Sequence, residues 1–250
     1  MSNSSTIVRS NADELARRER FRDLFLSSPI PAPEIQSNLG LFINRQTFSR
    51  FLFLHDLYQR IVPVHGIVAE FGVRWGQNLA LLTMLRGIYE PFNYNRRIVG
   101  FDTFSGFPAV SREDGTNPKV TAGAYGVADG YENFLDQVLT YHESEAPISH
   151  LNKYALVKGD VTKTIPDYIA QHPETIFAMA YFDFDLFAPT KLALEYVLPR
   201  MPRGGLLVFD ELNDKDFPGE TLALQEVLGV SKLRLQRLPF SGNASFAIVE

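Results

Sequence analysis

Five acidic residues stand at the ends of five predicted strands, and their placement is the main chemical signal in the sequence. Glu70, Asp102, Asp160, Asp183 and Asp210 each follow a short apolar run. If the strands are parallel, their carboxyl ends meet at one edge of the sheet, which is where open α/β sheets bind ligands. Carboxylates gathered there repel one another unless cationic or hydroxyl-rich groups lie among them. The sequence therefore predicts an acidic ligand site at this edge.

The loop at residues 70–76 joins the first of these strands to a helix. Gly72 and Gly76 allow its backbone to turn tightly and to approach a ligand closely. The loop lacks the third glycine of the dinucleotide fingerprint, which makes a nicotinamide cofactor a weak interpretation. Glu70, two residues before the first glycine, fits a cationic ligand better than a pyrophosphate.

The next two acidic strand ends suit the parts of a nucleoside. Asp102 is placed to accept hydrogen bonds from ribose hydroxyls. Asp160 could meet an adenine amine, or it could cap the helix that follows it. The sequence supports both interpretations of Asp160 equally.

Asp183 and Asp210, which end the last two strands of the parallel set, are each followed closely by a second acid, Asp185 and Glu211. Asp183, Asp210 and Glu211 could converge, and an all-oxygen ligand set suits magnesium. Asp185 would then remain as a general base. The alternative is that Asp185 caps the following helix and that Asp210 and Glu211 are solvated.

The elements that position these residues alternate between strand and helix. Strands are predicted at 67–71, 97–101, 154–157, 176–182 and 205–209, with helices at 77–89, 163–171, 189–200 and 219–229. This alternation predicts an α/β, Rossmann-like, mostly parallel sheet covered on both faces. Two further apolar stretches, near 233–235 and at 244–249, are joined by a short turn and must be antiparallel. The sheet therefore ends in a hairpin with one reversed strand.

Two segments lie outside this pattern. Residues 1–60 are interpreted as an N-terminal helical extension of a domain at 61–250, and their apolar helix around 48–58 would be buried against that domain or a second subunit. A homodimer or higher homo-oligomer is therefore one prediction. Residues 103–150 are too long for an ordinary connection and are interpreted as a lid or substrate insertion, with Tyr125, Tyr131 and His142 as candidate contacts.

Composition narrows the function classes. The 250 residues include no cysteine, which excludes disulfides and thiolate metal sites. The net charge of −5 and the lack of a basic patch argue against nucleic acid as a partner. No apolar run approaches the ~20 residues that span a bilayer, and the first residues are polar. We expect a cytoplasmic protein with a small-molecule partner and no membrane partner.

Together these motifs resemble the class I S-adenosylmethionine-dependent methyltransferases, and within them the macrocin O-methyltransferase (TylF-like) family. The resemblance covers about three quarters of the chain. The motifs that carry it are EFGVRWG at 70–76, GFDTFSGFP at 100–108, KGD at 158–160, FDFDLF at 182–187 and GGLLVFDE at 204–211. It implies a seven-stranded sheet and a magnesium-dependent methyltransferase that acts on a hydroxyl of a sugar or glycoside.

The resemblance also implies a role for each candidate residue. Glu70, Gly72 and Gly76 would line the methionine part of the donor S-adenosylmethionine. The ribose would be held by Asp102 with Ser105 nearby, and the adenine would lie between Asp160 and Val161. Magnesium would be held by Asp183, Asp210 and Glu211, and Asp185 would take the proton of the acceptor.

The sequence departs from the family pattern at one ligand. The family has Asp where this chain has Glu211, so Asn213 or Asp214 could take its place. Leu186 occupies the position of the lysine found in catechol methyltransferases, which disfavours a lysine base. Alternatives to a sugar hydroxyl are a sugar amine or a catechol-like diol as acceptor, or a non-catalytic binding protein.

Overall fold

The protein is built on one mostly parallel sheet. A computed structural model describes residues 10–250. The strands are β1 (Ile67–Phe71), β2 (Ile98–Asp102), β3 (Tyr154–Lys158), β4 (Phe177–Phe182), β5 (Leu206–Phe209) and β6 (Ser245–Ile248). They lie in the order β3-β2-β1-β4-β5-β6. All neighbours are parallel except β6, which is antiparallel to β5. The predicted α/β sheet with one reversed C-terminal strand is confirmed.

The prediction of seven strands is corrected to six within residues 10–250. The segment expected as a strand near 233–235 leads to a single antiparallel bridge, between Gln236 and Phe246. The short 3-10 helix η4 (Val230–Lys232) ends directly before it, and Pro239, which has no N–H to donate, follows soon after. This leaves too few residues in extended conformation to lengthen the ladder.

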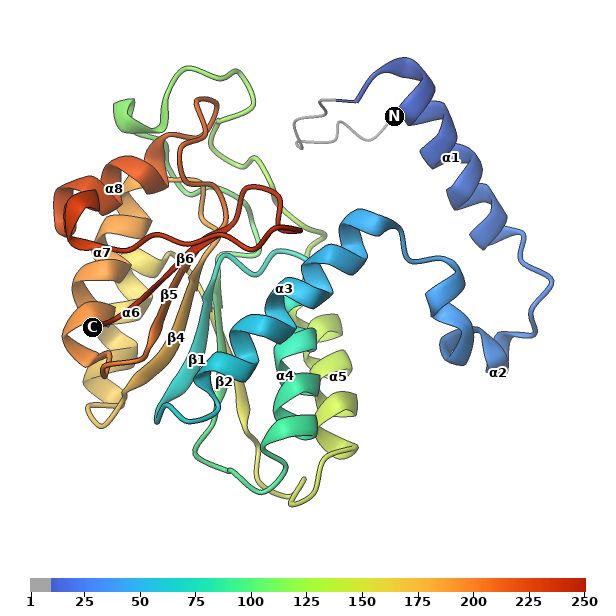
Figure 1. Ribbon diagram of the computed structural model, residues 1–250, viewed down its shortest axis with the longest axis horizontal. Helices are drawn as coiled ribbons and strands as arrows, with labels where there is room; N and C mark the ends of the chain where they lie inside the picture. Colours follow the sequence, from blue (N-terminus) through green and yellow to red (C-terminus); the bar gives the residue numbers. More distant parts are fainter. Residues whose placement is uncertain (1–9) are drawn as a thin grey trace.

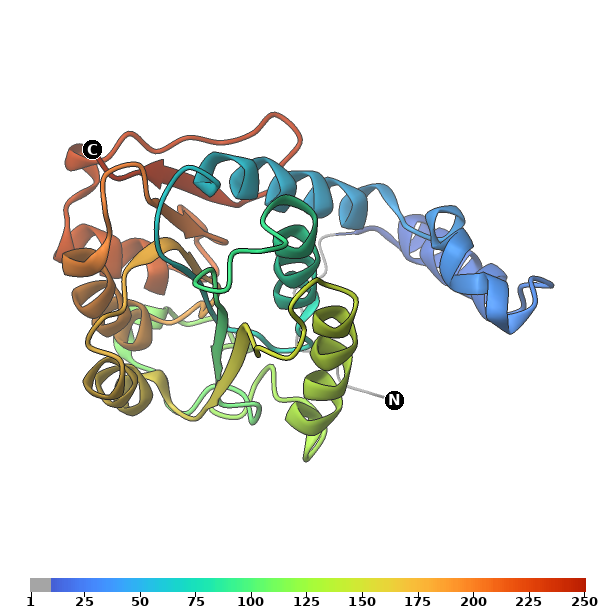
Figure 2. The ribbon, with the colours of Figure 1, turned by 90° about the horizontal axis from the view of Figure 1, so that it is seen from below.

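Helices cover both faces of the sheet. They are α3 (Arg45–Ile61), α4 (Gln77–Tyr89) and α5 (Tyr131–Ser144) on one face, and α6 (Val161–Gln171), α7 (Phe187–Val197) and α8 (Gly219–Val227) on the other (Figure 1, Figure 2). Short 3-10 helices, η2 (Arg112–Asp114) and η3 (Leu198–Arg200), lie in the connections. Apolar clusters fill both interfaces, so every residue of β1 and β4 is buried.

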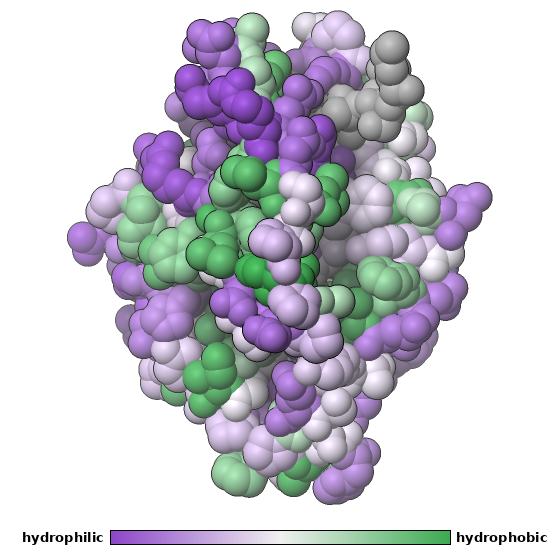
Figure 3. Space-filling model, turned by 90° about the vertical axis from the view of Figure 1, so that its right-hand side faces the viewer, coloured by the Kyte–Doolittle hydropathy of each residue, from purple (hydrophilic) through white to green (hydrophobic). Residues whose placement is uncertain are grey.

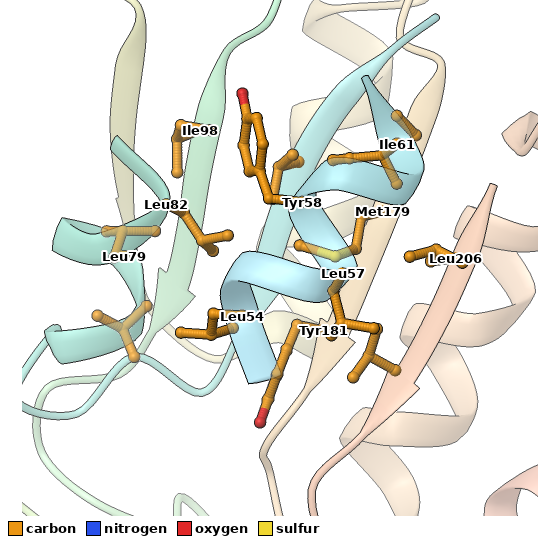
Figure 4. Close-up of a cluster of buried hydrophobic side chains, with 14 of the residues drawn as sticks. Leu54, Leu57, Tyr58, Ile61, Leu79, Leu82, Ile98, Met179, Tyr181 and Leu206 are labelled. Carbon is orange, nitrogen blue, oxygen red and sulfur yellow. The ribbon is translucent and has the colours of Figure 1, made fainter. Parts of the chain in front are cut away.

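Helix α3 is buried against the main domain, which was one of its two predicted positions. Leu54, Leu57 and Ile61 pack over Met179 of β4 and Leu206 of β5 (Figure 4). The 0% exposure of the three α3 side chains shows that this helix is part of the core. The N-terminal half of α3 is therefore fixed beside the carboxyl ends of β4 and β5.

The first helices form an arm that extends from the domain. They are α1 (Ala12–Leu26), α2 (Ala32–Ile35) and η1 (Gln36–Leu41) (Figure 2). Asn11 and Glu14 form a capping box at the N-terminus of α1. No residue of α1 is buried. The arm exposes Leu15, Phe21, Leu24, Leu26, Leu39 and Leu41. Figure 3 shows this side of the molecule, with patches of apolar side chains among polar ones. A single chain does not test the predicted homo-oligomer, which stays a prediction; residues 1–9 of the predicted extension lie outside the described part.

The long connection between β2 and β3 has two parts. Its second part contains α5, which packs beside α4 and buries Leu135 and Leu139 in the core. Its first part, residues 103–130, holds η2, and a small apolar cluster of Val120, Leu186 and Phe217 joins it to the domain. The predicted lid covers residues 103–150; its second part includes α5, which is packed in the core, and closure of residues 103–130 stays a prediction.

Among the described residues, no helix combines the length and apolar character needed to cross a bilayer. The predicted cytoplasmic location is a separate matter and stays a prediction.

Candidate functional site

A cavity of about 750 Å³ lies at the carboxyl ends of the parallel strands. Its volume is typical of small-molecule sites, which span roughly 300–1,000 Å³. Its lining includes ten of the predicted site residues, namely Glu70, Gly72, Gly76, Asp102, Asp160, Val161, Asp183, Asp185, Asp210 and Glu211. The remaining one, Ser105, is exposed and does not line the cavity. The edge that the sequence predicted therefore does form one concave site.

The loop between β1 and α4 follows a path that requires glycine at two positions. Gly72 has a φ of 98° and Gly76 a φ of 77°, both in the region that side chains disfavour. A Cβ at Gly72 would overlap the carbonyl oxygen of Asp183, and one at Gly76 would overlap the side chain of Leu135. The two glycines thus bring β1, β4 and α5 together beneath the cavity.

Asp102 holds this loop from the end of β2. Its Oδ2 accepts hydrogen bonds from the backbone N–H groups of Val73 and Arg74, each at 2.7 Å. Its Oδ1 accepts one from the N–H of Phe104 at 2.6 Å. A carboxylate oxygen can accept two hydrogen bonds, so Oδ1 keeps room for a hydroxyl donor. The expected contact with ribose stays a prediction.

Asp160 caps α6 and also lines the cavity. Its Oδ1 accepts from the N–H of Thr162 at 2.9 Å and from the hydroxyl of the same residue at 2.8 Å. Val161, the first residue of α6, is buried beside it. The capping interpretation is confirmed, and the adenine contact stays a prediction.

Glu70 is a buried carboxylate that lines the cavity, and its charge is only partly offset, by a hydrogen bond from Asn78 and by the charge of Arg50. It is 1% exposed, and its Oε2 has no hydrogen-bond partner among the described residues. Burial, followed by repulsion from Asp183, raises the pKa of Glu70 well above its usual value. A cationic ligand in the cavity would offset the charge of Glu70 further.

Arg50 of α3 supplies a positive charge that contacts both Asp183 and Asp210. Its Nη2 donates to Asp210 Oδ1 and lies 3.7 Å from Asp183 Oδ2. The hydroxyl of Tyr181 also donates to Asp210 Oδ1, at 2.6 Å. Burial and the charge of Asp210 nevertheless raise the pKa of Asp183 well above its usual value, and Arg50 offsets this only in part. The carboxylates therefore form an anionic cluster that one guanidinium does not neutralise.

The donor chemistry of this cluster suits magnesium, but its arrangement does not. Carboxylate oxygens from two neighbouring strand ends are the ligands that a hard divalent ion prefers. Within residues 10–250, however, no group of three His, Asp or Glu side chains is arranged to hold a metal ion. Arg50 bridges Asp183 and Asp210, the positions where such an ion would bind. As described, Asp183 and Asp210 are paired with the guanidinium of Arg50.

Asp185 has the environment of a proton acceptor. It lies at the start of the loop to α7, is 8% exposed and lines the cavity. Burial and repulsion from Asp183 raise its pKa well above the usual value, which favours proton uptake by a base. Its φ of 62° is uncommon for a residue with a side chain. Such strain is often found at functional positions.

Several residues of the site were missed by the sequence reasoning. Arg50 lies on a helix recognised only by its apolar stripe. Tyr181 does not line the cavity; it lies inside β4, where all residues are buried, and its hydroxyl reaches Asp210 from there. Tyr125 was named as a candidate contact, and it does line the cavity with its ring 4.8 Å from the guanidinium carbon of Arg74. A polar residue within an apolar stripe was the only available signal for Arg50.

Comparison with known proteins identifies the fold and the family. No protein-family model matches the chain, and no curated protein matches it. Among solved structures, CalS11, a calicheamicin methyltransferase, is 40% identical over 96% of this chain and 94% of that chain, with a TM-score of 0.93.

A second structure, the apo form of CalS11, described as a TDP-rhamnose 3'-O-methyltransferase of calicheamicin biosynthesis, is 37% identical over 97% and 96% with a TM-score of 0.86. The O-methyltransferase NovP shares the fold, with 16% identity over 80% and 79% of the two chains and a TM-score of 0.60. The chain therefore belongs to the S-adenosylmethionine-dependent O-methyltransferases, in the group of TylF-like sugar O-methyltransferases.

Proposed function

We propose that this enzyme transfers the methyl group of S-adenosylmethionine to a hydroxyl of a nucleotide-activated sugar. The observation that carries the proposal is the 40% identity to CalS11 over 96% of the chain. CalS11 is described as acting on TDP-rhamnose. The cavity supports this acceptor class, because about 750 Å³ leaves room for a sugar beside the donor.

The donor is proposed to lie along the β1 and β2 side of the cavity. Its cationic methionine end would approach Glu70, which is buried and whose Oε2 has no hydrogen-bond partner among the described residues. Gly72 and Gly76 allow the backbone to approach that end of the donor closely. Asp102 would accept from the ribose, and Asp160 and Val161 would flank the adenine. Ser105 is left out, because its side chain lies outside the cavity.

The reaction needs alignment and one proton acceptor. The sugar oxygen forms a bond to the methyl carbon while the bond from that carbon to sulfur breaks, which leaves neutral S-adenosylhomocysteine. The hydroxyl proton passes to the carboxylate of Asp185, whose raised pKa suits this role. Most of the rate enhancement is expected from holding oxygen, carbon and sulfur in line. Closure of residues 103–130 over the cavity would exclude water.

Magnesium is a separate part of the proposal. Asp183, Asp210 and Glu211 would supply its carboxylate ligands, and the ion, when bound, would supply positive charge near the acceptor oxygen. Arg50 contacts two of these three residues, so the proposal requires that Arg50 leaves them first.

Replacing Arg50 by methionine is therefore expected to strengthen magnesium binding by at least about tenfold, because Arg50 no longer competes with the ion for Asp183 and Asp210. A tenfold change in affinity corresponds to about 1.4 kcal/mol. Calorimetric titration of the purified protein with magnesium chloride measures this directly. The matched control is Arg60→Met on the same helix, since Arg60 pairs with Asp56 outside the cavity. Unchanged or weaker magnesium binding in Arg50→Met would show that Arg50 and the ion do not compete.

The proposed function is tested by incubating the enzyme with methyl-labelled S-adenosylmethionine and a series of acceptors. The series contains TDP-rhamnose, free rhamnose, a TDP-amino sugar and a catechol. We expect label on a hydroxyl of the nucleotide sugar, detected by mass spectrometry and NMR. Transfer only to the amine or only to the catechol would contradict the proposed acceptor while leaving the family assignment intact.

A further inference from the structure

Glu220 is a buried acid that fastens together the two loops carrying the proposed chemistry. It is the second residue of α8 and is 0% exposed. Its Oε1 accepts hydrogen bonds from the backbone N–H groups of Phe184 at 3.0 Å and of Asp185 at 3.2 Å. Its Oε2 accepts one from the N–H of Glu211 at 3.4 Å. One side chain thus joins the loop after β4 to the loop after β5.

The loop that Glu220 holds is strained at the proposed base. Asp185 has a φ of 62°, a conformation that persists only where the surroundings enforce it. Gly219 presses against the same loop, because a Cβ there would lie 2.6 Å from the carbonyl oxygen of Asp185. Asp114 fastens the loop from its other end by accepting from the N–H of Phe187 at 2.6 Å. The backbone on both sides of Asp185 is therefore fixed by other elements.

A carboxylate is an unfavourable choice for a purely structural link at this place. Burial, with repulsion from Asp183 and Asp210, raises the pKa of Glu220 well above its usual value. A neutral acceptor would avoid that repulsion. What the carboxylate offers is two oxygens at a fixed separation, which accept from two loops at once.

From this geometry we infer that Glu220 is a positioning residue for methyl transfer: it holds the backbone of Asp185 so that the base faces the acceptor, and it keeps Glu211 in register with that loop. The inference rests on the proposed role of Asp185. Glu220 itself does not line the cavity, so it acts through Asp185 and not on substrate.

The test compares Glu220→Gln and Glu220→Ala with the matched control Glu226→Gln. Glu226 lies on the same helix, and its side chain is 55% exposed and paired with Lys191. In Glu220→Ala all three hydrogen bonds are lost, and we expect kcat to fall about 100-fold, as a small misplacement of a reacting group does. The acceptor KM and the calorimetric affinity for S-adenosylmethionine are expected to stay within about threefold.

Glu220→Gln is expected to give an intermediate kcat. Its side-chain oxygen can still accept from Phe184 and Asp185, but its amide nitrogen cannot accept from Glu211. Hydrogen exchange gives a readout that does not depend on the acceptor. The amides of Phe184, Asp185 and Glu211 should exchange faster in Glu220→Ala, and their exchange rates should be unchanged in the control Glu226→Gln. If the alanine variant does not fold, the glutamine variant decides the test through its kcat and the amide of Glu211.

Wild-type kcat in Glu220→Ala, or unchanged exchange at these amides, would overturn the inference. A fall in kcat together with a raised acceptor KM and a weakened affinity for S-adenosylmethionine would also overturn it, because that pattern indicates a general disruption of the fold. If the wild-type enzyme itself methylates no acceptor, the proposed function fails, and the exchange data still decide whether Glu220 holds the two loops.

Discussion

Replacing Asp185 by asparagine should lower kcat by about 10²–10⁴-fold, the range expected when a general base is removed. Asparagine has nearly the same shape, and it cannot take up a proton. Asp185 lines the cavity, and burial and neighbouring carboxylates raise its pKa. The raised pKa makes it favourable for the ionised carboxylate to take the proton of the acceptor hydroxyl. The affinity for S-adenosylmethionine should be unchanged, because the proposed donor residues lie on other loops.

Steady-state kinetics and calorimetry on the same preparation measure both quantities. Asp167→Asn is the matched control, because Asp167 is an exposed residue of α6 outside the cavity and its replacement makes the same change of charge. Retention of more than about a tenth of wild-type kcat in Asp185→Asn would remove Asp185 as the base.

Replacing Gly72 by alanine should lower the stability of the protein strongly. The backbone there has a φ of 98°, and strain of this kind costs about 1–3 kcal/mol. The added Cβ would also overlap the carbonyl oxygen of Asp183 at the end of β4, and overpacking costs a similar amount. We expect the free energy of unfolding to fall by about 2–6 kcal/mol, with loss of donor binding.

Two glycine controls separate the two causes in denaturant unfolding experiments. Gly123 has a φ of 80° but no atom within 4 Å of an added Cβ, so Gly123→Ala isolates the backbone strain. Gly40→Ala has neither strain nor overlap and should be neutral. If Gly72→Ala cost no more than Gly123→Ala, the close contact between the β1 loop and β4 would not be a constraint on the site.

The sheet could be predicted from sequence because its signals are local. The run at Ile67–Phe71 is apolar at four of its five positions and is followed by glycines, and the strand has the same bounds in the structure. The seventh strand, near residues 233–235, was predicted wrongly because the only signals used were local. Alternating Leu233 and Leu235 indicate an extended chain, but no local pattern says whether a neighbour is long enough to pair with it.

Only the site residues at strand ends could be predicted from the sequence, because the course of the backbone alone fixes their place. A residue that ends a parallel strand must lie at the ligand-binding edge, and this rule brought Glu70, Asp102 and Asp183 to one cavity. Arg50 and Glu220 come from helices, and their arrival depends on how α3 and α8 pack on the sheet. Arg50 reaches the cavity because the next turn of its helix, at Leu54, is buried in the core. Such placement is a tertiary property with no signature in residue spacing.

We propose that the acidic edge of the sheet holds the donor beside the acceptor, and a crystal structure with S-adenosylhomocysteine and TDP-rhamnose tests this most directly. We expect the homocysteine end against Glu70 and Gly72, with a sugar hydroxyl within hydrogen-bond distance of Asp185. A donor product bound elsewhere, or a sugar whose hydroxyls all lie beyond reach of Asp185, would contradict it.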